Sequence, residues 1–124
     1  VTIHAGELGS ADNVRWAVEQ CQAVRVGHAL AAAGDPQLTE FLVASGTVVE
    51  TCLTSNVLTT AVPDLTDHPA VRLFAAGVPI VLGTDNPALH GKNLSDEYAI
   101  AGRLFSPEAI DRIAANSNRY RFGH

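Results

Sequence analysis

An apolar run that ends in an acid reads Val78-Pro79-Ile80-Val81-Leu82-Gly83-Thr84-Asp85-Asn86-Pro87. Its β-branched and apolar residues predict a buried strand over residues 78–82. Pro87 lacks a backbone N–H and cannot continue the hydrogen-bond ladder of a strand. The run therefore predicts a strand that carries Asp85 just beyond its carboxyl end. Taken alone, Asp85 could equally be a residue that caps a turn.

Three further strand-like runs precede this one, at residues 1–4, 23–27 and 47–51. Between and after these runs the apolar residues recur at helical spacing. Proline is favoured in the first turn of a helix, and serine is favoured at the N-cap. We expect helices from Ser10 to Cys21, from Pro36, from Pro69, over residues 94–104 and from Pro107 to Asn116. Residues 31–34 are expected to form a loop of small residues.

Four apolar strands, each followed by a helix, predict parallel βα units in an α/β fold. This pattern fits half of an eight-unit barrel or a small open sheet. Ionisable residues stand at or just beyond the ends of all four strands, and these are His4, Glu7, His28, Glu50 and Asp85. In βα barrels this rim carries the chemistry, so the pattern favours a barrel with one shared site.

The composition limits the function classes that remain. The 124 residues are 47% hydrophobic and carry a formal charge of -5, which fits one folded domain and excludes a basic surface for a nucleic-acid polymer. No apolar stretch reaches the roughly 20 residues of a membrane span, and we expect neither a membrane span nor a secretory leader. Two cysteines, Cys21 and Cys52, are expected to be buried and reduced. We expect a cytoplasmic protein.

The first residue is Val1, and the β-branched Val1-Thr2-Ile3 already has strand composition. We therefore expect the chain to be one part of a larger domain. His4 follows this strand, and Glu7 stands three residues later, past a glycine that permits a tight turn. Such a histidine can bind a metal. Each histidine at a strand end could also be a hydrogen-bonded core residue, and this applies to His28 as well.

Taken in order, the stretches of sequence around His4, His28, Glu50 and Asp85 resemble the adenosine deaminase family of zinc-dependent aminohydrolases. The resemblance extends along nearly the whole chain. It implies an α/β fold in which residues 1–124 form the carboxyl-terminal half of a (β/α)8 TIM-type barrel, with strands five to eight present and the amino-terminal half absent. The matching pieces are residues 3–7, 26–28, 50–56, 68–69, 77–80, 83–87, 94–98 and 115–117.

The resemblance also implies a role for each site residue. His4 and Asp85 would be ligands of Zn²⁺, and Glu7 would donate a proton to the ring of an aminopurine substrate that loses ammonia. His28 would act as a base or as an electrostatic partner of the attacking water. The remaining substrate contacts would come from Gly6 and Asn86.

The family supplies further imidazole ligands from a His-x-His pair, which this chain lacks. The amino-terminal half barrel is therefore an expected partner, in cis or in trans. His68 is expected to be structural, with a hydrogen bond that fixes the start of the helix at Pro69.

Three positions depart from the family pattern. Asn86 stands where a second acid is usual, Leu53 stands where proline is usual, and Ala29 stands where glycine is usual. Asn86 can donate through its amide but cannot carry charge, so the identity of the aminopurine stays open. The alternatives are a deaminase of adenine or of another aminated purine derivative, and a noncatalytic half barrel with a structural or partner-binding role.

Overall fold

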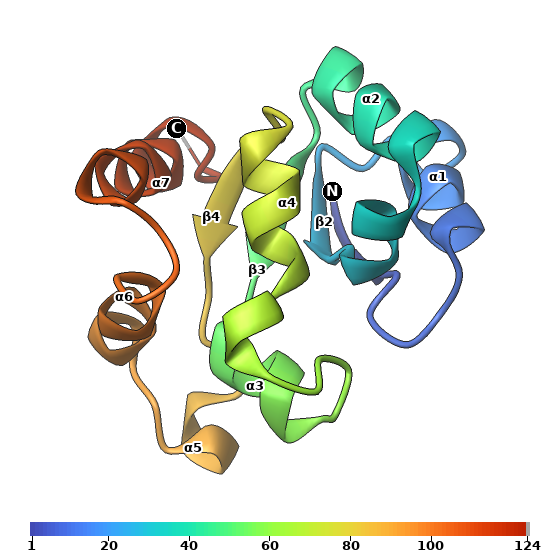
Figure 1. Cartoon of the computed structure of the whole chain (residues 1–124). Helices are drawn as coiled ribbons and strands as arrows, with labels where there is room; N and C mark the ends of the chain where they lie inside the picture. The colour runs from blue at the N-terminus through green and yellow to red at the C-terminus, as the bar shows by residue number, and fades with distance from the viewer. Residues whose placement is uncertain (124) are drawn as a thin grey trace.

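Four parallel strands form the centre of the structure, a computed structural model that describes residues 1–123 (Figure 1). Their order in the sheet follows their order in the chain, which is β1 (Thr2–Ala5), β2 (Arg25–His28), β3 (Val48–Thr51) and β4 (Ile80–Leu82). Parallel neighbours require a crossover connection, and every connection here contains a helix. The prediction of parallel βα units is confirmed.

In Figure 1, the helix α4 lies in front of the strands, α1 and α2 lie to the right, α6 and α7 lie to the left, and α3 and α5 lie below the strand ends. Their bounds are α1 (Ala11–Glu19), η1 (Leu30–Gly34), α2 (Pro36–Ser45), α3 (Leu53–Leu58), η2 (Leu65–Asp67), α4 (Pro69–Ala75), α5 (Pro87–His90), α6 (Leu94–Ala101) and α7 (Pro107–Arg119). In residues 1–123, no helix is long and apolar enough to cross a membrane.

The register of the strands gives the sheet two different faces. Ile3, Val26, Val49 and Ile80 are aligned across the four strands, as are His4, Gly27, Glu50 and Val81. Because side chains alternate along a strand, each aligned set lies on one face. The first set packs in the apolar core with helical residues such as Leu38, Leu42, Leu73 and Ile113. The second set, which contains His4 and Glu50, faces away from this core.

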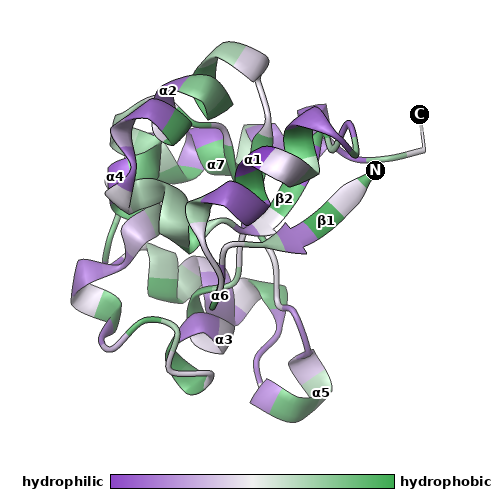
Figure 2. Cartoon of the chain, turned by 90° about the vertical axis from the view of Figure 1, so that its right-hand side faces the viewer, coloured by the Kyte–Doolittle hydropathy of each residue, from purple (hydrophilic) through white to green (hydrophobic). Residues whose placement is uncertain are grey.

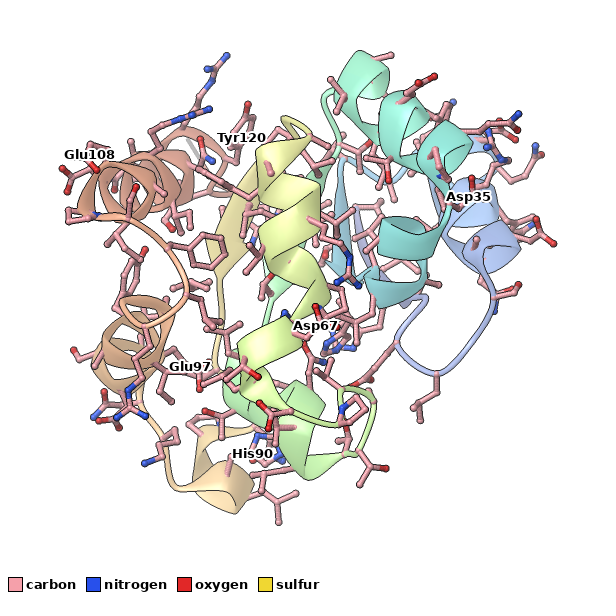
Figure 3. The ribbon with its side chains drawn as sticks, in the orientation of Figure 1. Asp35, Asp67, His90, Glu97, Glu108 and Tyr120 are labelled. Atoms are coloured by element: carbon pink, nitrogen blue, oxygen red, sulfur yellow. The ribbon has the colours of Figure 1, made fainter. Side chains whose placement is uncertain are left out.

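Side-chain hydrogen bonds fix several helix ends. Asp35 accepts from the backbone N–H of Leu38 at 3.0 Å and so caps α2. On α6, the buried Glu97 accepts from the backbone N–H of Thr54 at 3.3 Å, which ties α6 to the start of α3. Figure 3 shows Asp35 on the side of α1 and α2 and Glu97 on the side of α6. Ser10 occupies the N-cap of α1, but its side chain makes no capping hydrogen bond.

The structure differs from the sequence prediction mainly at short helices. Residues 31–34 belong to η1 and are not a loop, because His28 (φ +68°) and Ala29 (φ +48°) turn the chain back and the N–H of Ala31 donates to Gly6 O at 2.9 Å. The short helices α3 and α5 were not expected. The helix α1 ends before Cys21, α6 ends at Ala101, and α7 continues to Arg119.

Candidate active site

Side chains from the ends of the strands meet in one pocket of about 290 Å³. Its lining includes His4, His28 and Asp85, together with Gly27 and Glu50. The imidazole rings of His4 and His28 meet edge to face, with centroids 5.0 Å apart and planes at 87°. The shared rim expected from the sequence therefore exists, and it brings three of the predicted site residues together.

Gly27 makes room for the ring of His4. The two residues are neighbours in the register of β1 and β2. A Cβ atom on Gly27 would stand 2.5 Å from Cδ2 of His4, which is closer than real Cβ contacts. Glycine at this position therefore lets the His4 ring lie across β2 beside His28.

Glu7 reaches the site from the turn after β1. The turn depends on Gly6, which has φ +71° and whose missing Cβ would collide with Val14. Oε1 of Glu7 accepts from Asn56 Nδ2 at 3.2 Å and from Thr59 Oγ1 at 3.1 Å. Its Oε2 lies 3.6 Å from Nε2 of His28. The carboxyl group is thus held in one orientation, with Oε2 directed toward His28.

His28 is buried at the end of β2, with 2% of its surface exposed. Its Nδ1 lies 2.9 Å from Nδ2 of Asn56, and its Nε2 faces Glu7. Burial lowers the pKa of His28 by disfavouring the charged ring, and the carboxylate of Glu7 opposes this effect. The ring is therefore a sequestered imidazole with a carboxyl group as its neighbour.

Asp85 follows β4 in a left-handed conformation, with φ +57°. Its Oδ2 accepts from Ser55 Oγ at 2.6 Å, a short bond that orients the carboxylate. The next residue, Asn86, is exposed and caps α5 by accepting from the N–H of Leu89 at 3.0 Å. Because its Oδ1 is engaged in this way, Asn86 has its Nδ2 to offer to a ligand.

Glu50 lies at the end of β3, on the face of the sheet that carries His4, and it lines the pocket as the rim pattern predicts. Its Oε1 lies 2.6 Å from Nε of Arg25 and accepts from Thr2 Oγ1 at 3.0 Å. Arg25 also donates to the backbone oxygen of Tyr120 at 3.1 Å. Glu50 is therefore engaged in an ion pair between neighbouring strands on the wall of the pocket.

Cys52 also lines this pocket and is buried and free, as expected. Burial raises the pKa of its thiol to about 12, and the carboxylates of Asp85, Glu97 and Glu50 act in the same direction. The Cys52 thiol is thus a protonated, weakly reactive group. Cys21 is only partly buried, which differs from the expectation.

His68 has the structural role expected from the sequence. It is the N-cap of α4, and its Nδ1 accepts from the backbone N–H of Ala70 at 3.1 Å. Its Nε2 lies 3.2 Å from Oδ1 of Asn56. Burial lowers the pKa of His68 to about 4, and the positive charge of Arg72 contributes to this. His68 is therefore neutral in the folded protein.

Three further residues hold the site and were not predicted from the sequence, namely Ser55, Asn56 and Thr59. They lie on α3 or directly after it and contact Asp85, His28 and Glu7. One signal could have indicated Ser55 and Asn56, since they closely follow a strand that lies between those of His28 and Asp85. No such signal indicates Thr59.

His4 and Asp85 fit a zinc ion as part of a ligand set. Imidazole nitrogen and carboxylate oxygen are both zinc donors, and both side chains line the same pocket. The bond from Ser55 to Asp85 is the kind of outer contact that orients a ligating carboxylate. Within residues 1–123, no three His, Cys, Asp or Glu side chains are grouped so that they could hold a metal ion.

Comparisons with known proteins show which proteins the chain resembles. The family model described as adenosine deaminase matches residues 1–123. An adenosine deaminase from Aliivibrio fischeri is 38% identical over 118 residues, which are 94% of this chain and 35% of the relative. An aminodeoxyfutalosine deaminase from Acidothermus cellulolyticus is 43% identical over 111 residues, which are 84% of this chain and 31% of the relative.

Solved structures match almost the entire chain. An adenine deaminase from Arthrobacter aurescens superposes with a TM-score of 0.93 at 30% identity, over 99% of this chain and 38% of that structure. An amidohydrolase from Burkholderia ambifaria, crystallised with bound Zn, superposes with a TM-score of 0.89 at 26% identity, over 99% of this chain and 35% of that structure.

The chain spans about a third of the length of the relatives that it matches. Its four-stranded parallel sheet and outer helices correspond to half of a TIM-type barrel. The fold predicted from the sequence is thereby confirmed.

Proposed function

This chain belongs to the adenosine deaminase family, and on that premise we propose that it forms the carboxyl-terminal half of a zinc-dependent aminohydrolase that removes ammonia from an aminopurine. The observation that carries the proposal is the meeting of His4, His28 and Asp85 in one pocket, with Glu7 3.6 Å from His28. An acid, an imidazole and two potential metal ligands are thereby grouped where the barrel strands end.

Each side chain has a task that its surroundings support. His4 and Asp85 would hold the zinc ion, which supplies an activated water at neutral pH when it is bound. Glu7, with Oε1 engaged by Asn56 and Thr59, would donate a proton from Oε2 to a ring nitrogen of the substrate. His28, next to this oxygen, would act on the attacking water as a base or as an electrostatic partner.

The substrate class is an aminated purine, a nucleoside or a free base. The names of the similar proteins include deaminases of adenosine, adenine and aminodeoxyfutalosine. Gly6 lies at the turn before Glu7, where a substrate ring could approach the backbone, and Asn86 would donate from Nδ2. Because Asn86 has no charge, it would favour a ring atom that accepts a hydrogen bond.

We also propose that an amino-terminal half barrel completes the site. The sheet ends at β1 on one side and at β4 on the other, and Figure 2 shows β1 at its edge. Beside β1, Leu8 is 76% exposed and Trp16 is 59% exposed, and both line a hollow of about 420 Å³. Packing of the missing half against this hollow would cover both side chains and supply the further zinc ligands.

The direct test is Glu7→Gln in the completed barrel. Glutamine keeps the shape of the side chain but has no proton to transfer, so we expect turnover to fall by about 10²-fold or more. Zinc stoichiometry should stay unchanged. The matched control is Glu108→Gln on α7, which changes an exposed carboxyl group in the first turn of that helix.

Ammonia release and zinc content are measured for both variants and for the parent protein. Unchanged turnover in Glu7→Gln would remove Glu7 from the acid role. A parent protein that binds zinc but releases no ammonia from any aminopurine would favour the noncatalytic alternative.

A further inference from the structure

A continuous chain of buried polar groups connects the start of α4 with the pocket. The backbone N–H of Ala70 lies 3.1 Å from His68 Nδ1, and His68 Nε2 lies 3.2 Å from Asn56 Oδ1. Asn56 Nδ2 lies 2.9 Å from His28 Nδ1. His68 and Asn56 are fully buried, and His28 is 2% exposed. These side chains therefore form their hydrogen bonds with one another and not with water.

The backbone amide fixes the direction of this chain at its first link. An N–H group can only donate, so Nδ1 of His68 must accept and carries no proton. His68 is neutral, since burial lowers its pKa to about 4. Its single proton is therefore on Nε2, and it is donated to Oδ1 of Asn56.

The second link follows from the first. When Oδ1 of Asn56 accepts from His68, the amide nitrogen of Asn56 points to the other side, toward His28 and Glu7. Nδ2 carries two protons and accepts none. One of these protons is donated to Oε1 of Glu7 at 3.2 Å. This bond requires the same orientation of the Asn56 amide as the bond from His68, with Nδ2 toward Glu7 and His28. Nδ1 of His28 must therefore accept.

We propose that Asn56 and His68 are positioning residues that hold His28 as the tautomer protonated at Nε2. The neutral ring then presents an N–H donor toward Glu7 and the pocket, because its other nitrogen is occupied by Asn56. This inference rests on the proposed function and chooses between the two roles left open for His28. The neutral ring has no free lone pair on the pocket side, so it stabilises developing negative charge there and does not act as a base.

The tautomer can be read directly by nitrogen NMR of histidine-labelled protein, in the completed barrel and at alkaline pH. The two-bond couplings between the ring nitrogens and the carbon-bound ring protons distinguish a proton on Nε2 from a proton on Nδ1. We expect both His28 and His68 to carry the proton on Nε2. A wild-type His28 with its proton on Nδ1 would overturn the inference without any need for a variant.

Asn56→Asp is the decisive variant. A carboxylate can only accept, so the proton of His28 should move to Nδ1 while His68 keeps its proton on Nε2. With the wrong tautomer at the pocket, we expect kcat to fall by at least about tenfold with little change in KM. Asn118→Asp makes the same chemical change at an exposed position of α7 and should alter neither the tautomer nor kcat.

Two substitutions of His68 separate positioning from packing. His68→Gln can still donate to Oδ1 of Asn56 and should preserve the tautomer of His28 and most of kcat. His68→Leu removes the donor, and the His28 signals should then show both tautomers, with a lower kcat. Equal kcat in the two variants, with one unchanged tautomer, would contradict the inference.

The NMR signal tests the tautomer of His28, and ammonia release tests the proposed function, so either result can be negative without the other. Ammonia release by a protein whose His28 is protonated on Nδ1 would refute the inference and leave the proposed function intact. A His28 protonated on Nε2 in a protein that releases no ammonia would refute the proposed function and support the tautomer.

Discussion

The missing side chain of Gly27 determines where the ring of His4 can lie. A Cβ atom on Gly27 would stand 2.5 Å from Cδ2 of His4, so Gly27→Ala must displace the imidazole. If His4 binds zinc, its displacement should weaken zinc affinity by about tenfold or more, which is the usual cost of disturbing the support of a ligand. The affinity is measured by competition with a chelator.

Gly34→Ala is the matched control for this prediction. Among the described residues, nothing lies within 4 Å of the Cβ that this change would add. The control should keep the zinc affinity of the parent protein. Equal affinities in Gly27→Ala and the parent would mean that His4 is not a ligand.

Asn86 should determine which aminopurine is preferred. We expect Asn86→Asp to change the ranking of aminopurine substrates, because a carboxylate exchanges a neutral donor for a charged acceptor. Zinc stoichiometry should stay constant, since the proposed zinc ligand at this strand end is the neighbouring Asp85 and not Asn86. The measurement is kcat/KM for adenosine, adenine and an N6-substituted analogue, with zinc content determined in parallel. A loss of zinc without a change in ranking would show that Asn86 is part of the metal site.

At the scale of the elements, strands were easier to predict than the short helices that support the site. Each strand has an apolar run followed by a polar residue, and a period of two needs only a few residues to become visible. The helix α3 has six residues, too few to show a helical period. The bond from Asn56 to His28 joins residues 28 positions apart, so no local pattern could have indicated it.

The N-cap of α4 should make stability depend on pH. The pKa of His68 falls from 6.5 to about 4 on folding, so the unfolded chain binds the proton more strongly. The contribution of neutral His68 is therefore complete above pH 6.5 and declines as the pH falls toward 4. A shift of this size corresponds to a loss of about 3 kcal/mol.

The test compares the parent protein with His68→Gln by urea unfolding across this pH range. Glutamine does not titrate, so the variant should lose less of its free energy of unfolding between pH 6.5 and 4. Because other titrating groups are common to both proteins, the difference between them isolates His68. Parallel curves would show that His68 is not held neutral by the fold.

At the scale of the molecule, the alternation of strands and helices predicted parallel βα units, and the strand order β1-β2-β3-β4 in the sheet confirms them. The polar residues at the strand ends and the family resemblance favoured half of a barrel over a small open sheet. The sequence also indicated that the rim gathers polar residues. It did not indicate the partner of Glu50, because a strand-end position alone does not show that Arg25 on the neighbouring strand will pair with it at 2.6 Å. Cross-strand partners depend on register, which becomes known only when the sheet is formed.

The sheet ends at β1, where an amino-terminal half barrel would continue it. We expect this chain alone to bind no zinc stoichiometrically and to release no ammonia, because His4 and Asp85 supply only two of the three or more protein ligands of a catalytic zinc site. Addition of an amino-terminal half barrel that carries a His-x-His strand should produce zinc binding and ammonia release together. Each half by itself should show neither.

Trp16 reports whether the halves dock in the expected place. It is the single tryptophan of the chain and lines the hollow beside β1. A fluorine label on its indole should shift in the ¹⁹F NMR spectrum when the amino-terminal half is added, because burial changes the surroundings of the ring. The fluorine signal should shift at the same ratio of halves at which zinc binding appears. An isolated 124-residue chain that is monomeric, binds zinc and deaminates an aminopurine would contradict the half-barrel proposal.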